Sequence, residues 1–235
     1  MDQDLALYVH IPFCEYKCTF CDFATYTGQE RRADAYVEAL LREIDLRAPH
    51  TVGGRSPSVF FGGGTPSLLP AAEIRRILAA LDHAFALAPD AEITLESNPD
   101  TLPPAHLRAL RDAGVTRLSI GVQSLNDGLL RSLNRLHTGA QALQALDAAR
   151  HAGFSSVSAD LIYGLPGQDR RDWEGTLQGL LAAEPDHLSI YGLIVEPGTR
   201  LRHQLVRGLP RLPDEDEAAE MYEYARDALG AHGYV

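Results

Sequence analysis

Cysteine, tryptophan and basic residues are all scarce in this 235-residue sequence. It has three cysteines and one tryptophan, and its 21 Lys and Arg face 32 Asp and Glu, which gives a net charge of -11. Three cysteines cannot form a disulfide framework in which every thiol is paired. The acidic balance argues against a broad nucleic-acid interface, which needs a surplus of Lys and Arg. We therefore expect no nucleic-acid partner.

Long apolar runs are also missing. No segment approaches the roughly 18 apolar residues of a membrane-spanning helix. The first residues, MDQDLALYVH, have no basic region, and their apolar run is too short for a signal peptide. These absences, together with a few tightly clustered cysteines, predict a protein of the reducing cytoplasm with no membrane span.

Short β-type runs alternate with helical patterns along almost the whole chain. A length of 235 residues fits one large domain, since α/β barrels reach about 200–250 residues as a single unit. Strands are predicted at 5–11, 58–63, 92–97, 117–122, 156–164 and 187–193. Helices are predicted near 32–48, 70–86, 103–113, 139–152, 169–183 and 214–231, from apolar residues at helical spacing.

Six successive β-then-α units predict a parallel sheet with right-handed crossovers. A closed eight-unit barrel would need two more units, so we predict an α/β fold with a partial (β/α)6 barrel of the TIM type, spanning 1–235 as one domain. An open doubly wound sheet is the alternative.

Boundary residues support several of these elements. Pro70, Pro103 and Asp214 stand at helix starts, and Gly114 and Gly153 follow helical runs as C-terminal caps would. The stretch 196–213 is predicted to be a loop. The final residues, HGYV, have the pattern of a strand that has just begun, which predicts that the chain is the N-terminal part of a longer protein whose C-terminal domain is missing here.

Polar and glycine residues recur where the predicted strands end. GGGTPS follows the second strand, ESNPD the third, GVQS the fourth, and EPGT the sixth, while DLIYGLPG surrounds the end of the fifth. The carboxyl ends of parallel strands meet on one face, where ligands bind in such folds. The cysteine-containing segment also follows a strand, so all these features point to one site.

All three cysteines lie within eight residues, at Cys14, Cys18 and Cys21. Four interpretations are open: a disulfide, which an odd count disfavours; a zinc site completed by His10 or Asp22; buried apolar thiols or a redox pair; and an iron–sulfur cluster. We favour the cluster. Three thiolates would leave one iron of a [4Fe–4S] cluster open, where S-adenosylmethionine could bind for radical chemistry.

The segment CEYKCTFC matches the Cys-x3-Cys-x2-Cys signature of the radical S-adenosylmethionine superfamily. Together with YVHIPFC, FFGGGTPSLL, ESNPDTL, GVTRLSIGVQSLND and DLIYGLPGQ, it resembles the oxygen-independent coproporphyrinogen III oxidase family and its HemW-type heme chaperones. The likeness runs from about residue 5 to the end of the chain.

This resemblance implies a role for each matching residue. Cys14, Cys18 and Cys21 would hold the [4Fe–4S] cluster. The residues that would contact S-adenosylmethionine are Tyr8, Phe20, Gly63, Gly64, Thr65, Glu96, Gln123, Arg135, Asp160 and, with a weaker match, Ile194.

The residue types are compatible with those roles. The glycines allow close approach of the backbone and would leave N–H donors free. Glu96 and Asp160 could accept hydrogen bonds from an ammonium group or from ribose hydroxyls, and Arg135 could pair with a carboxylate. Each also has a structural alternative; Arg135, for example, follows Arg131 at helical spacing and could belong to an exposed arginine stripe.

Two functions of different class follow from the resemblance. One is the oxidase, which decarboxylates coproporphyrinogen III to protoporphyrinogen IX by radical chemistry. The other is a chaperone that binds heme and transfers it to an acceptor protein. The oxidases carry a further cysteine two residues after the third cluster cysteine, and Phe23 stands there in this sequence. We therefore favour the chaperone, with heme or a porphyrin, an acceptor protein and a reductant for the cluster as partners. Whether the chain is an enzyme stays open.

Overall fold

The computed structural model describes residues 4–50, 55–208 and 211–235. Its main feature is a six-stranded parallel sheet in the order β1-β4-β5-β6-β7-β8. The strands are β1 (Leu7–Ile11), β4 (Ser56–Gly63), β5 (Leu87–Ser97), β6 (Arg117–Gln123), β7 (Ser156–Tyr163) and β8 (His187–Gly192). All six predicted strands are therefore confirmed.

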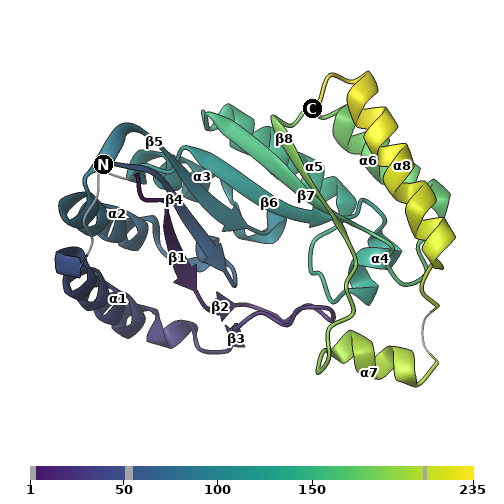
Figure 1. Ribbon diagram of the computed structural model, residues 1–235, viewed down its shortest axis with the longest axis horizontal. Coiled ribbons are helices and arrows are strands. Elements are labelled where there is room, and N and C mark those ends of the chain that lie inside the picture. The colour runs from purple at the N-terminus through teal and green to yellow at the C-terminus, as the bar shows by residue number, and fades with distance from the viewer. Residues whose placement is uncertain (1–3, 51–54, 209–210) are drawn as a thin grey trace.

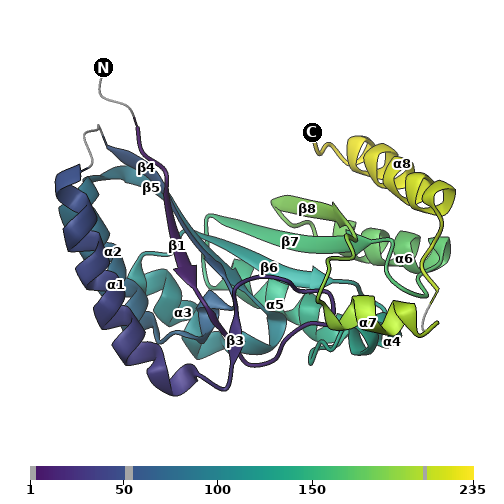
Figure 2. The ribbon, with the colours of Figure 1, turned by 60° about the horizontal axis from the view of Figure 1, so that its bottom comes forward.

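Helices between successive strands cover the outer side of the curved sheet (Figures 1 and 2). The helices are α1 (Ala33–Arg47), α2 (Ala71–Phe85), α3 (Pro104–Ala113), α4 (Asp127–Ser132), α5 (Gly139–His151), α6 (Arg170–Leu181), α7 (Arg200–Val206) and α8 (Glu215–Ala231). α8 follows the last strand and packs on α6, and α7 lies beside the segment that joins β1 to α1. Short 3-10 helices lie at Glu30–Arg32, Ala48–His50, Pro66–Leu68 and Pro99–Thr101.

The spatial order of the strands equals their order in the chain. A doubly wound sheet would reverse direction at a switch point, with helices on both faces. The observed order instead continues one way round, as in a barrel, and the described strands leave β1 and β8 as the two edges. The partial (β/α)6 barrel is confirmed, and the doubly wound alternative is wrong.

Apolar and polar residues alternate along the strands, so that the two faces of the sheet differ in character. Val9, Val59, Leu95 and Ile120 are among the buried residues that pack beneath the helices. A parallel strand buried on both faces would be apolar throughout. Here the intervening positions are largely polar; they include His10, Thr94, Glu96, Ser119, Ser158 and Asp160. The inner face of the open barrel can therefore hold a polar ligand.

The predicted helix boundaries are largely confirmed. Pro70, Pro103 and Asp214 occupy N-cap positions, and the Asp214 side chain accepts a hydrogen bond from the backbone N–H of Glu217. Gly114 caps α3 in the left-handed conformation with φ 113°. Local chemistry was sufficient to predict these ends.

Two expectations near the C-terminus were wrong. The predicted loop 196–213 contains α7, because the Thr199 side chain caps the helix by accepting from the Arg202 N–H and Leu201 is buried; residues 209–210 lie outside the described residues. The HGYV segment forms a turn rather than a strand, and the Tyr234 N–H donates back to Leu229 O (3.0 Å).

The cysteine loop, defined here as residues 14–25, runs from the last residue of β2 (Phe13–Cys14) to β3 (Tyr26–Thr27), and these two short strands pair with each other. Its Thr19 is buried and joins the loop to two distant segments. The Thr19 N–H donates to Leu133 O (3.1 Å), and Thr19 O accepts from the Leu201 N–H of α7 (2.8 Å). α4 and α7 therefore help to fix the loop at the end of the barrel.

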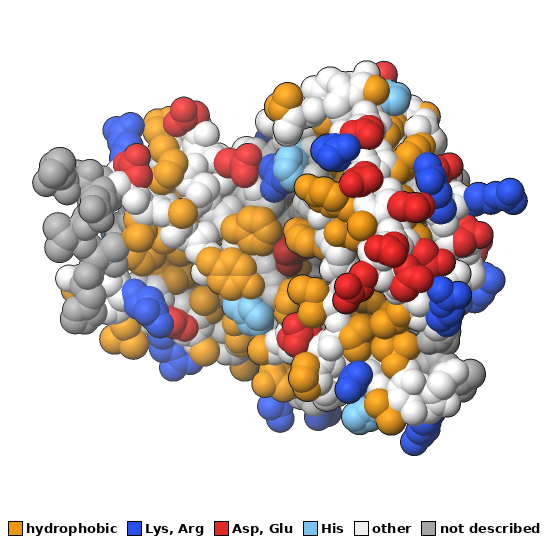
Figure 3. All heavy atoms as spheres, turned by 45° about the vertical axis from the view of Figure 1, so that its right-hand side comes forward, with side chains coloured by type: hydrophobic (Ala, Val, Ile, Leu, Met, Phe, Trp, Pro, Cys, Tyr) orange, Lys and Arg blue, Asp and Glu red, His pale blue; other side chains and the backbone are white. Residues whose placement is uncertain are grey.

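Surface features agree with the composition. Figure 3, which brings the α8 side forward, shows many acidic side chains, and Glu215, Asp216 and Glu217 all lie in the first turn of α8. Acidic residues at a helix N-terminus are favourable. No helix within the described residues is long and apolar enough to cross a membrane.

Replacing Trp173 with alanine is expected to lower the free energy of unfolding by about 3–5 kcal/mol, because it removes a large buried side chain. Trp173 is fully buried in α6, and its Nε1–H donates to Met221 O of α8 (2.7 Å). Denaturant unfolding measures the change. Leu46→Ala, at a position 72% exposed, is the control and should change stability by no more than about 0.5 kcal/mol.

Candidate functional site

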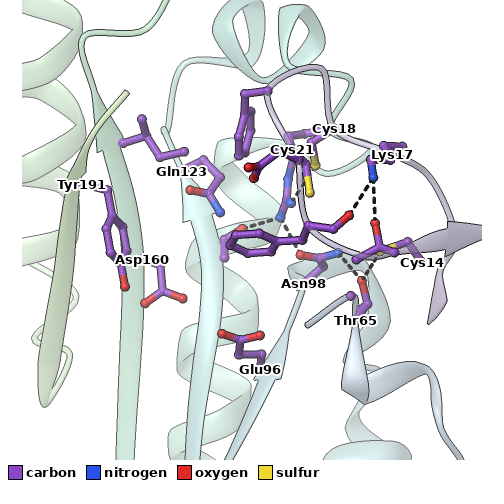
Figure 4. Close-up of a pocket in the computed structure, with 18 of the residues that line it drawn as sticks. Cys14, Lys17, Cys18, Cys21, Thr65, Glu96, Asn98, Gln123, Asp160 and Tyr191 are labelled. Carbon is purple, nitrogen blue, oxygen red and sulfur yellow. Dashed lines mark hydrogen bonds between the residues drawn. The ribbon is translucent and has the colours of Figure 1, made fainter. Parts of the chain in front are cut away.

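A cavity of about 410 Å³ opens at the carboxyl ends of the strands, beside the cysteine loop (Figure 4). Twelve of the thirteen site residues predicted from the sequence line it. They are Cys14, Cys18, Phe20, Cys21, Gly63, Gly64, Thr65, Glu96, Gln123, Arg135, Asp160 and Ile194. Residues far apart in the sequence therefore meet at one place, as the strand-end motifs predicted.

Tyr8 is the predicted residue that does not line this cavity. Its ring stacks on Phe60, with 6.1 Å between ring centroids, and its hydroxyl contacts His10 Nδ1 (3.1 Å). It is 61% exposed. Tyr8 thus neighbours the site, on the strand that leads into the cysteine loop, and does not form the cavity wall.

The three cysteines are free thiols that project from the cysteine loop toward the cavity (Figure 4). Cys14 is buried, and Cys18 and Cys21 are half-buried. The disulfide interpretation is therefore wrong for this structure. Within the described residues, no group of three or more His, Cys, Asp or Glu side chains is close enough to hold a single metal ion. A [4Fe–4S] cluster makes a different demand, since each thiolate binds its own iron.

His10, one candidate for the fourth ligand of a zinc site, has both ring nitrogens engaged. Nδ1 contacts the Tyr8 hydroxyl, and Nε2 contacts Ala24 O at 3.0 Å. It is therefore a packed histidine that ties β1 to the cysteine loop. Asp22, the other candidate, lines the cavity.

Two of the sulfurs receive hydrogen bonds from the cavity wall. Thr65 Oγ1 lies 3.7 Å from Cys14 Sγ and donates to it, and Arg135 Nη1 donates to Cys18 Sγ at 3.5 Å. Burial raises the pKa of the Cys14 thiol, while hydrogen bonds from Thr65 and Thr25 and the charge of Lys17 lower it. Donors and cations of this kind stabilise thiolates, the form that binds iron.

The glycine motif after β4 approaches the loop very closely. A Cβ atom on Gly64 would lie 2.5 Å from Phe13 O and 3.0 Å from Cys14 Sγ, so only glycine fits there. Gly63 has φ 112°, in the region that favours glycine.

The expectation that this motif leaves N–H donors free was wrong. The Gly63 N–H donates to Glu96 Oε2 (3.0 Å), the Gly64 N–H to Ile11 O (2.8 Å) and the Thr65 N–H to Phe13 O (2.7 Å). The sequence showed the glycines but not where the neighbouring carbonyl and carboxylate oxygens lie. The motif thus provides close approach and a rigid edge to the cavity.

Glu96 and Asp160 form an acidic wall on β5 and β7 (Figure 4). Burial raises the pKa of Glu96 to about 7; the Gly63 N–H works against this, and the charge of Asp160 adds to it. Burial also raises the pKa of Asp160, although the Ser119 hydroxyl lies 2.8 Å from Asp160 Oδ2 and lowers it. Two half-buried carboxylates with room in front of them are suited to hydroxyl or ammonium groups of a ligand.

Glu96→Gln is expected to flatten the pH dependence of stability. The folded-state pKa of about 7 exceeds the ordinary glutamate pKa of 4.5. As the pH rises from 4.5 to 7, the unfolded chain gains the charge first, so the wild-type free energy of unfolding falls relative to that of the variant. The difference reaches about 3 kcal/mol above pH 7 and disappears below pH 4.5.

Denaturant unfolding at several pH values measures the difference. Glu92→Gln, at an exposed position of the same strand, is the matched control. Parallel profiles for wild type and Glu96→Gln would show that Glu96 is already ionised at low pH in the folded protein.

Arg135 is 7% exposed and lies against the cysteine loop. Its Nη2 donates to Asn98 Oδ1 (2.8 Å) and to Gly121 O, and its guanidinium lies 5.8 Å from the centroid of the Tyr16 ring. Arg131 is exposed but Arg135 is buried. Arg135 therefore does not belong to an exposed arginine stripe, and that alternative is wrong. The buried Arg135 Nε has no protein partner among the described residues, which is consistent with a carboxylate-binding residue.

Gln123 also carries a local signature of a site. It has φ 66° and lies at a register irregularity between β6 and β7. A left-handed non-glycine residue is uncommon, and such strain concentrates at functional sites. The bulge turns Gln123 into the cavity wall.

Several lining residues were not predicted as site residues. Asn98 lies within the ESNPD motif, so its position after a strand was a usable signal. Lys17 and Thr25 belong to the cysteine loop, where Lys17 Nζ donates to Thr25 Oγ1 (3.2 Å) and Phe23 O (2.9 Å). Tyr191, on β8, gave no such signal, because one aromatic residue in a strand is most often part of a core.

Comparison with known proteins agrees with this geometry. The model of the Radical SAM superfamily matches residues 8–180. The chain belongs to the radical SAM superfamily. Membership implies a [4Fe–4S] cluster and S-adenosylmethionine as cofactors.

Individual radical SAM relatives are similar over nearly the whole chain. The heme chaperone HemW of Bacillus subtilis is 37% identical over 227 residues, which cover 96% of this chain and 60% of that protein. Radical S-adenosyl methionine domain-containing protein 1, mitochondrial, of Bos taurus is 42% identical over 232 residues, 99% of this chain and 52% of that protein. This chain therefore spans about half to three-fifths of the length of these relatives.

Among solved structures, coproporphyrinogen III oxidase (HemN) from Escherichia coli is similar, with a TM-score of 0.88 and 34% identity. The match covers all of this chain and 54% of that one. It supports the partial-barrel fold directly.

The cavity fits both implied cofactors of the radical SAM superfamily. Three free thiols share one wall with a buried arginine that has an unsatisfied N–H, and the glycine cradle keeps one thiol next to the strand ends. When bound, the cluster would supply one-electron chemistry to S-adenosylmethionine. Cys14, Cys18 and Cys21 would hold the cluster, with Glu96, Asp160 and Arg135 available to orient the polar groups of the second cofactor.

Proposed function

We propose that this chain forms the cluster- and cofactor-binding part of a heme chaperone of the HemW type, which binds heme and passes it to acceptor proteins. The thiols of Cys14, Cys18 and Cys21 bind the cluster and leave one iron for S-adenosylmethionine. The proposed contacts of the latter are Phe20, Gly63, Gly64, Thr65, Glu96, Gln123, Arg135, Asp160 and Ile194, with Tyr8 beside them.

The observation that carries this proposal is Phe23. It lines the cavity, is 61% exposed, and stands where the oxidase branch has a further cysteine. The phenyl ring of Phe23 has no thiol group and cannot take the place of that cysteine. The curated relatives in bacteria that resemble this chain, including those of Bacillus subtilis and Escherichia coli, are described as heme chaperones.

The mouth of the cavity is consistent with a large flat ligand. Tyr191 and Ile194 on the β8 side are 58% and 70% exposed, although both line the cavity together with Phe23. Exposed apolar side chains that gather at the mouth of one cavity, unlike single scattered ones, are typical of a ligand or partner surface. A porphyrin ring could cover them.

The alternative is oxygen-independent coproporphyrinogen III oxidase activity. The match to the HemN structure favours it, since fold and cofactor face are shared. Phe23 argues against it, because it occupies the position at which the oxidases carry the additional cysteine.

The proposal can be tested with the complete gene product, reconstituted anaerobically and reduced. We expect it to bind hemin stably, seen in its absorption spectrum, and to transfer it to an apo-acceptor such as apomyoglobin. Coproporphyrinogen III with S-adenosylmethionine should stay unconverted. Formation of protoporphyrinogen IX over many turnovers would overturn the chaperone proposal in favour of the oxidase.

The remaining partners follow from this function. A chaperone with a redox-active cluster needs a reductant and a heme-acceptor protein. Free thiols poised for a cluster suit a reducing compartment such as the cytoplasm.

A further inference from the structure

Asn98 lies between two residues that contact different cysteine sulfurs (Figure 4). We propose that Asn98 is a positioning residue that controls the hydrogen bonds to Cys14 and Cys18 together, and thereby sets the reduction potential of the cluster. The inference rests on the cluster site of the proposed function and does not depend on whether heme is the cargo.

The orientation of the Asn98 amide follows from its neighbours. Arginine carries only donors, so the amide oxygen must face Arg135, whose Nη2 donates to Asn98 Oδ1 at 2.8 Å. The amide nitrogen then faces Thr65 and donates to its Oγ1 at 3.3 Å. Each half of the amide therefore has one partner and one direction.

On one side of Asn98, the Thr65 hydroxyl is a hydrogen-bond donor to Cys14. A hydroxyl has one hydrogen, and because Thr65 Oγ1 accepts from Asn98, that hydrogen is free to point at Cys14 Sγ, 3.7 Å away. Thr65 is 3% exposed, so water does not compete for the hydroxyl.

On the other side of Asn98, the Arg135 guanidinium places a hydrogen-bond donor and a positive charge next to Cys18. Asn98 and Gly121 O both hold Nη2, which leaves Nη1 directed at Cys18 Sγ, 3.5 Å away. Arg135 is almost fully buried. A long arginine side chain has many rotamers, and fixing one nitrogen limits where the other can lie.

Asn98 is itself held rigidly by the turn after β5. Its backbone N–H donates to Thr101 Oγ1 (3.3 Å), which in turn donates to Asn98 O (2.8 Å). Pro99 is buried at the start of the 3-10 helix that follows. The amide is therefore a fixed point from which Thr65 and Arg135 are both positioned.

Hydrogen bonds to cluster sulfurs stabilise the reduced, more negative state, which raises the reduction potential. Loss of Asn98 frees the Thr65 hydroxyl to turn away and loosens Arg135. Both sulfurs then lose part of their hydrogen bonding, and the potential falls.

The test is the midpoint potential of the reconstituted cluster, without S-adenosylmethionine. Asn98→Ala should lower it relative to wild type. Asn126→Ala, which removes the N-cap of α4 and its bonds to Gly128 and Leu129 N–H, matches the chemical change and controls for destabilisation; it should leave the potential unchanged.

Variants of Thr65 test whether Asn98 acts on Cys14 through the Thr65 hydroxyl or only through a general loss of stability. Thr65→Val, which loses the hydroxyl, should lower the potential, and Thr65→Ser, which keeps it, should restore it. In the double variant Asn98→Ala with Thr65→Val the shift should be smaller than the sum of the single shifts, because both act through the bond to Cys14.

An unchanged potential in Asn98→Ala with a fully assembled cluster would overturn the proposal. So would a shift that is equal in Asn126→Ala, or shifts of the two single variants that add. If Asn98→Ala does not assemble a cluster, the two Thr65 variants provide the test. Equal reduction potentials for Thr65→Val and Thr65→Ser would then overturn the proposal. Failure of heme transfer in wild type leaves these outcomes readable, since they need only the cluster.

Discussion

Replacing Cys18 with alanine is expected to abolish cluster binding. Iron content after anaerobic reconstitution should fall from about four per chain to almost none, and the broad absorption near about 400 nm should vanish. The chain has three cysteines in all, so no other thiol can take the place of Cys18. The two remaining thiolates, Cys14 and Cys21, are too few to hold a [4Fe–4S] cluster firmly.

The control for this variant is Glu15→Ala, an exposed position of the same loop. It should retain full iron content. A Cys18→Ala protein that still takes up four irons would contradict the assignment of this loop, as would a Glu15→Ala protein that loses them.

Arg135→Met is expected to weaken S-adenosylmethionine binding by about 30-fold to 5000-fold, since truncating one partner of a buried charge pair costs about 2–5 kcal/mol. Arg135 is buried at the cavity wall with Nε unpaired among the described protein groups. Its guanidinium can pair with the carboxylate of the cofactor. Equilibrium binding to the reconstituted protein gives the affinity directly.

Arg131→Met is the matched control, because the same chemical change falls four residues earlier on an exposed side chain. Its affinity should equal that of wild type. Equal affinities for all three proteins, with intact clusters and unchanged melting temperatures, would mean that Arg135 serves the thiolates alone.

The architecture was readable from the sequence because its signals are local. Alternating strand and helix patterns gave six strands in order, and capping residues such as Pro103, Asp214 and Gly114 marked helix ends. α7 escaped prediction since a seven-residue helix gives too short a periodic signal, and its stability depends on Leu201 packing and on the bond to Thr19.

The site was predictable as a set of motifs and not as a network. Spacing placed the cysteines and strand ends on one face, and twelve predicted residues do line one cavity. The contacts between motifs were invisible. Nothing in ESNPD indicates that Asn98 joins Thr65 to Arg135, because that depends on side chains from three separate strand ends.

The predicted contact of Tyr8 with S-adenosylmethionine stays a prediction. Motif agreement placed Tyr8 at the cofactor, while the side chain stacks on Phe60 and bonds to His10 outside the cavity wall. The direction of a side chain on a twisted strand is decided by its packing neighbours, which the sequence does not order in space.

We propose that Cys14, Cys18 and Cys21 hold a [4Fe–4S] cluster with one iron open to S-adenosylmethionine. Mössbauer spectroscopy of the reconstituted protein, with and without S-adenosylmethionine, tests it most directly. We predict about four irons per chain, of which one changes its isomer shift when S-adenosylmethionine is added. Bound zinc without iron uptake, or four irons that all stay unchanged on addition, would contradict the account.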